Sequence, residues 1–183
     1  MAQMNVALDA NASSISTFPG SDPTWTGVYF HSIVDAPGTV ATNNYLAILN
    51  PSGSGKIAIA LGFITSSYST GSVTAVQSLT AFRTTAQSVG TLVAASAVNR
   101  FVTTFPNPAS EVRTGNPTVT TTGSKMIGLA PVIGGTAGNG PAVMPTPGAS
   151  FVFQPGQGIV FNVPAGDVQQ FWNMQYIWAE KSL

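Results

Sequence analysis

The chain contains no cysteine and very little charge. Its 183 residues include six basic and six acidic side chains, so only 7% are charged, against about 25% in an average globular protein. Without cysteine there is no disulfide framework, no thiolate metal site and no cysteine nucleophile. Six basic residues offset by six acids cannot form the strong basic patch that nucleic acid requires, and the same shortage excludes a polybasic membrane anchor.

Targeting signals and metal-binding clusters are also missing from the sequence. The opening MAQMNVALDA has no positive leader followed by an apolar stretch, so we expect no signal peptide. The sequence has no run of about 18 apolar residues, so we expect no membrane-spanning helix. One histidine argues against a histidine-based zinc site, and no Asp-x-Asp cluster indicates calcium. We therefore expect no metal, no cofactor and no contact with nucleic acid or membrane.

What the chain does contain is apolar and small residues, with 44% hydrophobic side chains, 19 glycines and 13 prolines. This length predicts a single domain, and the hydrophobic content is enough to form a core. A free monomer normally keeps itself soluble with surface charge, whereas a nearly uncharged surface promotes association. The composition therefore predicts a subunit of an assembly.

Residues that favour strands alternate with turn formers from Trp25 onward. The predicted strands are 25–34, 45–49, 56–64, 73–85, 118–122, 151–153, 159–163 and 168–178, with turns at 35–38 and 66–72 and a strand or irregular crossing at 90–104. Several short strands with Gly/Pro turns and no clear helix predict an all-β domain over residues 25–183, as an antiparallel sandwich, jelly roll or barrel.

The last predicted strand has the clearest pattern. At a period of two, Trp172, Met174, Tyr176 and Trp178 fall on one side, and we predict that this side packs into the core. The other side, at 171–177, carries Phe, Asn, Gln and Ile, and we expect it to face a second layer, solvent or a partner.

Two further segments are candidates for contacts with neighbouring subunits. For residues 1–24 we predict an extended N-terminal arm, with a disordered tail as the alternative. For residues 131–148 we predict a long Pro/Gly-rich loop, which either contacts another subunit or is only flexible. Three arginines, Arg83, Arg100 and Arg113, lie in apolar or Thr-rich surroundings, where pairing with Glu111, Asp167 or Glu180, within or between subunits, is a hypothesis. The predicted contact residues are Phe18, Arg100, Arg113, Val132, Ile133 and Met144.

Motifs that suggest chemistry are weak. The stretch Ser52–Lys56 resembles the end of a phosphate-binding loop, but Asn50 stands at the first glycine position and Ile57 at the hydroxyl position. A strand is predicted after it, where a phosphate site requires a helix, so we predict a strand-connecting turn. His31, with Asp35 four residues later, leaves a hydrolase with a Ser-His-Asp triad open, because the members of a triad need only be close in space. The absence of a Gly-x-Ser-x-Gly elbow argues against it and favours a structural or surface histidine. We predict no enzyme and no catalytic residue.

The aromatic residues leave another alternative open. Trp25, Tyr29, Trp172, Tyr176 and Trp178 suit a sugar-stacking platform in a carbohydrate-binding β-sandwich. Their alternative role is core packing, which the period-two placement of Trp172 and Trp178 favours.

Three short motifs together resemble small structural proteins of tailed bacteriophage particles, namely head-decoration or cement proteins and head fibres. The motifs are the turn 50–56 before an Ile-rich strand, the entry Pro155-Gly156-Gln157-Gly158-Ile159, and the closing Trp178-Ala179-Glu180. In that group the second motif commonly carries Glu where this chain has Gln157. The resemblance spans residues 45–180 and excludes the arm and the long loop.

The resemblance implies a jelly-roll β-sandwich that acts without catalysis in the virion, assembled in the bacterial host cytoplasm. Its expected partners are further copies of itself, as a dimer or trimer, and the major capsid protein. The expected function is decoration or cementing of the capsid shell, in which many weak repeated contacts add avidity. A tail, neck or fibre protein with host-receptor binding, or a carbohydrate-binding module, remains the alternative.

Overall fold

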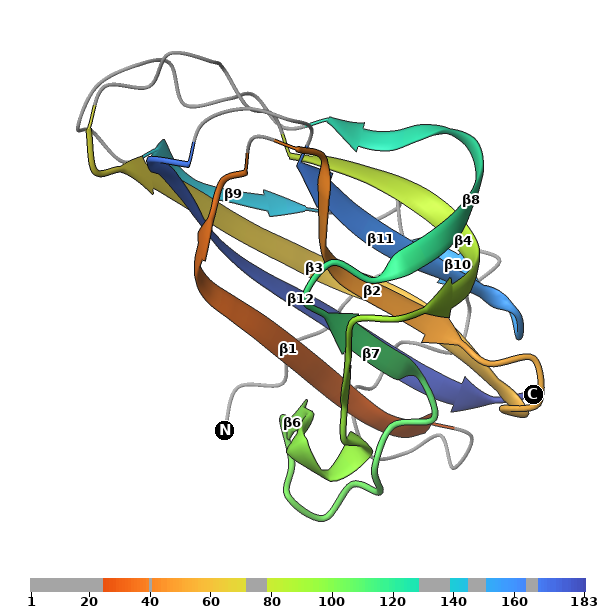
Figure 1. Cartoon of the computed structure of the whole chain (residues 1–183). Coiled ribbons are helices and arrows are strands. Elements are labelled where there is room, and N and C mark those ends of the chain that lie inside the picture. The colour runs from red at the N-terminus through yellow and green to blue at the C-terminus, as the bar shows by residue number, and fades with distance from the viewer. Residues whose placement is uncertain (1–24, 40, 72–78, 129–138, 145–150, 164–167) are drawn as a thin grey trace.

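A computed structural model describes residues 25–39, 41–71, 79–128, 139–144, 151–163 and 168–183. These residues form two six-stranded sheets packed together (Figure 1). Sheet A contains β1 (Trp25–Pro37), β3 (Lys56–Ser69), β6 (Asn99–Arg100), β9 (Asn139–Met144), β10 (Val152–Phe153) and β12 (Gln170–Ser182). Sheet B contains β2 (Asn43–Asn50), β4 (Thr80–Ser88), β5 (Thr91–Val93), β7 (Glu111–Thr114), β8 (Thr118–Gly128) and β11 (Gln157–Val163).

The strand pairing is nested. The antiparallel pairs are β1 with β12, β2 with β11, β3 with β9, and β4 with β8. Successive pairs alternate between sheet A and sheet B, as when one long hairpin is wound around a core. This arrangement is a jelly roll, so the predicted all-β, jelly-roll-like sandwich is confirmed.

An irregular insertion joins β4 to β8. It contains β5, a 3₁₀ turn at Ala95–Ala97, β6 and β7, which agrees with the irregular crossing predicted at 90–104. β7 and β5 extend sheet B beyond β2, whereas β6 pairs with β1 only at Tyr29 and Phe30. The insertion therefore adds strands to one edge of each sheet.

The core lies between the sheets and is rich in aromatic rings. The predicted inward side of the last strand is confirmed, because Trp172, Met174, Tyr176 and Trp178 are all buried. Phe63 of sheet A stacks on Phe161 of sheet B with ring centroids 4.1 Å apart. Burying each large apolar side chain contributes roughly 1.5–3 kcal/mol, so this cluster is a main source of stability.

Two predicted turns belong to strands instead. At 66–69 the chain continues β3, because Thr65 and Ser67 lie inward against β12 and the Thr65 hydroxyl donates to the Asn173 carbonyl at 3.0 Å. At 35–37 the chain continues β1. Asp35, with φ of 52°, lies in a bulge between Ile33 and Ala36, and pairing with β12 resumes at Ala36. A turn-forming residue thus bends the strand without ending it.

The remaining differences concern the segments between strands. Within the Pro/Gly-rich loop predicted at 131–148, Asn139–Met144 forms β9 along the edge of β3, so the loop prediction is wrong for these six residues. The predicted arm at 1–24 and the rest of that loop lie outside the described residues, as does 73–78 of the strand predicted at 73–85.

Candidate interaction surfaces

The motifs behind the phage resemblance meet at one corner of the sandwich. Asn50, at the end of β2, is buried, and its side-chain Nδ2 donates to the carbonyl of Lys56 at 2.8 Å and to that of Phe153 at 3.0 Å. The backbone carbonyl of Asn50 accepts from the Gly156 N–H at 2.7 Å. One asparagine therefore fastens the turn that changes sheets to the Gly156 motif.

Each residue of the Gly156-Gln157-Gly158 entry has a distinct structural reason. Gly156 has φ of +81°, which side-chain-bearing residues rarely adopt. Gln157 Oε1 accepts from Arg83 Nη1 at 2.8 Å, and the Arg83 guanidinium lies 5.2 Å from the Phe153 ring centroid. Gly158 passes so close to β2 that a Cβ would lie 2.0 Å from the Ile48 carbonyl oxygen.

The closing Trp178-Ala179-Glu180 motif forms a buried clamp. The Glu180 carboxylate is 1% exposed and accepts from the Ala109 and Ser110 N–H groups, both at 2.8 Å, and from Trp178 Nε1 at 3.2 Å. Three donors satisfy the buried charge. The clamp fixes the segment before β7 against β12, so all three motifs maintain the shape of the sandwich.

The predicted contact residues do not gather in one place. Arg100, on β6, donates from Nη1 to the Phe105 carbonyl, and Arg113, on β7, donates to the Val89 carbonyl, both at 2.9 Å. Contact of either with a second subunit stays a prediction. Phe18, Val132 and Ile133 lie outside the described residues, and of Met144 only the backbone, in β9, is described.

A groove of about 430 Å³ opens between β1 and the turn after β7, and all its lining side chains are uncharged at neutral pH. Polar members of its lining include His31, Asn43, Tyr45 and Asn116. Burial lowers the pKa of His31, and its Nδ1 has no hydrogen-bond partner among the described residues. The Tyr45 hydroxyl donates to the Pro37 carbonyl.

The geometry supports neither of the two chemical hypotheses from the sequence, a hydrolase that uses His31 and a sugar-stacking platform of aromatic rings. Asp35, suggested as a partner of His31, accepts from the Tyr68 hydroxyl at 3.0 Å. Three or more potential metal ligands do not cluster anywhere in the described part of the chain. Four of the five aromatics suggested as a sugar platform are core residues, namely Tyr29, Trp172, Tyr176 and Trp178, and the Trp25 side chain is not described. These four rings cannot stack on a sugar.

A surface of which the sequence predicted only the part on β12, at 171–177, lies on the outside of sheet A. Cross-strand partners share a face, so the register places Phe30 beside Ile177, Gln175 beside Ile64, and Phe171 beside Tyr68. We call this surface the outer face of sheet A. Its defining residues are Phe30, Ser32, Ile57, Ile59, Ile64, Ser66, Tyr68, Phe101, Phe171, Asn173, Gln175 and Ile177.

The outer face carries two aromatic pairs with a hollow between them. Phe101 is 58% exposed and packs edge-on against Phe30 at 5.1 Å, and Tyr68 stacks on Phe171 at 5.2 Å. The hollow measures about 220 Å³ and is lined by residues of β1, β3 and β12 that include Gln175. The alternation in 171–177 had predicted an outward side without saying what covers it.

No family model, no curated protein and no solved structure matches this chain. Within the described residues, no helix is long and apolar enough to cross a membrane.

Proposed function

We propose that this protein is a non-enzymatic structural subunit of a bacteriophage virion that decorates or cements the capsid shell. The outer face of sheet A is the observation that supports this proposal most. Eight of its twelve defining residues are aliphatic or aromatic. The charged side chains next to them are at the two ends of the face, Asp35 beside Tyr68 and Lys181 beside Ile57. Apolar patches of this kind on a soluble domain mark sites of protein contact.

The corner of the sandwich that the three sequence motifs form supports the same proposal. The Asn50 turn, the Gly156 entry and the Glu180 clamp use hydrogen bonds and backbone geometry to hold strands in place. A shell protein requires a rigid shape that repeats identically many times, and its strength comes from the avidity of repeated contacts. The major capsid protein and other copies of this chain are the partners that we propose.

Quantitative mass spectrometry of purified particles tests the proposal. We expect a copy number near that of the major shell protein, because a decoration protein follows the shell lattice. A much lower ratio would assign the protein to the neck, tail or fibre. Absence of the chain from particles would refute a virion function.

The uncharged groove beside His31 favours one other candidate, a carbohydrate-binding module. Its hydroxyl, amide and imidazole groups suit a neutral, hydroxyl-rich ligand, which needs a few placed polar groups in a concave site. A glycan array followed by titration tests this candidate. Binding that survives both Asn43→Ala and Asn116→Ala would exclude the groove as the site.

A further inference from the structure

The large aliphatic side chains of β3 point away from the core. In the first half of the strand the inward positions are Ala58 and Ala60, both in the core cluster, whereas Ile57 and Ile59 alternate with them and lie outward. The Trp178 ring, across from Ala60, fills the interior at this point, so only a small inward residue fits. The sandwich itself therefore does not account for the outward isoleucines.

We propose that the outer face of sheet A binds the same face of a second copy of this chain, with the strands of the two sheets antiparallel. The inference deepens the proposed structural function, on which it rests, by naming the partner of one surface. Two sheets pack face to face about 10 Å apart, and a two-fold axis makes such a contact self-complementary.

The relief of the face supports this two-fold packing. The Phe30–Phe101 pair stands next to the hollow, because Ser32 and Gln175 line the hollow and follow Phe30 and Ile177 on the same side of their strands. An axis that passes between the pair and the hollow inserts the aromatic pair of each copy into the hollow of the other. Buried aromatic anchors in pockets carry much of the binding energy of protein interfaces.

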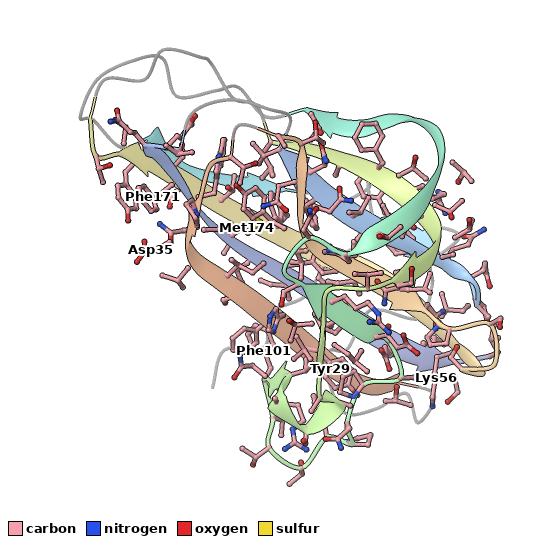
Figure 2. All side chains as sticks on the ribbon, viewed as in Figure 1. Tyr29, Asp35, Lys56, Phe101, Phe171 and Met174 are labelled. Atoms are coloured by element: carbon pink, nitrogen blue, oxygen red, sulfur yellow. The ribbon has the colours of Figure 1, made fainter. Side chains whose placement is uncertain are left out.

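Charge supports the antiparallel orientation. Figure 2 shows Asp35 and Phe171 at one end of sheet A and Lys56 at the opposite end. Lys181 lies at the Lys56 end, in register with Ile57. Antiparallel packing directs the acidic end of each copy toward the basic end of the other, whereas parallel packing would place like charges together.

The area is sufficient for a stable dimer. The three long strands of sheet A, β1, β3 and β12, have 13, 14 and 13 residues, and the short strands β6, β9 and β10 have 2, 6 and 2. At about 3.3 Å per residue and about 4.8 Å between strands, these six strands cover roughly 800 Å² per copy. A standard interface buries about 800 Å² per partner.

Sedimentation equilibrium of the full chain tests the proposal first. We expect a reversible monomer–dimer equilibrium and, for Phe101→Ala, a dissociation constant raised about tenfold or more. The matched control is Leu92→Ala, since Leu92 is also an exposed apolar residue, 51% exposed, but lies on β5 of sheet B. Circular dichroism must show that both variants are folded. A monomer at every soluble concentration, or equal effects of the two variants, would overturn the proposal.

A charge exchange tests the orientation. Asp35→Lys and Lys181→Glu should each weaken the dimer, and the double variant should restore most of the affinity, because the exchange recreates opposite charges at facing ends. The high-salt affinities of the four proteins should converge. Singles that leave the affinity unchanged, or a double variant weaker than both singles, would refute antiparallel packing.

Different results would refute the proposed interface and the proposed function. A dimer that responds to Phe101→Ala but is missing from virions would leave the interface intact and remove the virion function. If the chain is present at shell copy number but Phe101→Ala leaves its dimerisation unchanged, the proposed function stands and this interface is refuted.

Discussion

Replacing Gly158 by alanine should separate two strands at the centre of sheet B. The new Cβ would lie 2.0 Å from the Ile48 carbonyl oxygen and 2.8 Å from Leu49 Cα, and Cβ atoms essentially never come within 3.0 Å of such atoms. β11 must therefore move about 1 Å away from β2, since both obstacles are backbone atoms. Gly158 also pairs with Thr84 of β4, so the displacement affects both neighbours of β11.

The expected loss in the free energy of unfolding is large enough to measure. Overpacking and weakened ladder hydrogen bonds together cost about 3 kcal/mol, which lowers the Tm of a domain of this size by about 6–12 °C. Thermal unfolding followed by tryptophan fluorescence and by circular dichroism measures it. Gly53→Ala is the matched control, because its Cβ would meet nothing within 4 Å. A Gly158→Ala protein as stable as the control would refute the close-approach argument.

Three further predictions use other parts of the fold. Gln157→Glu should raise the free energy of unfolding by about 0.5 kcal/mol, because its acceptor bond from Arg83 becomes an ion pair; the gain should vanish in concentrated salt, and Gln157→Leu should lose stability instead. Val89→Asn should stabilise by about 1 kcal/mol in urea unfolding, because Val89 is 67% exposed and has φ of 54°, which asparagine tolerates better; a less stable variant would contradict this. Burial raises the pKa of Tyr29 and Tyr45 from 10.0 to about 12. Stability should therefore be fully present below pH 10 and fall between pH 10 and pH 12, where only the unfolded chain ionises these groups; unchanged urea midpoints across this interval would refute the burial argument.

The fold was predictable where side chains alternate strictly in size. The rings of Trp172 and Trp178 repeat at a period of two, and both are buried as predicted. The prediction of a turn failed at 66–69, because serine is typical of turns, yet in β3 the small side chains of Ser67 and Ser69 lie inward. Local composition cannot show that this stretch pairs with the distant strand β12.

The outer face was less predictable than the core. The strand at 56–64 was recognised from its apolar residues, but both its alanines and its isoleucines are apolar, so hydrophobicity does not say which set lies inward. That choice depends on the rings of β12 and β1 that fill the space beneath β3. Likewise, Phe101 meets Phe30 only because β6 pairs with β1 across about 70 residues of chain.

The position of β12 has a consequence for synthesis on the ribosome. Sheet A is ordered β10-β3-β12-β1-β6, so the strand made last among those described lies between β3 and β1, both made much earlier. Long-range pairing of this kind is slow to form, and until β12 emerges the facing edges of β1 and β3 have no strand between them. We therefore expect the nascent chain to require protection from aggregation until β12 has been translated.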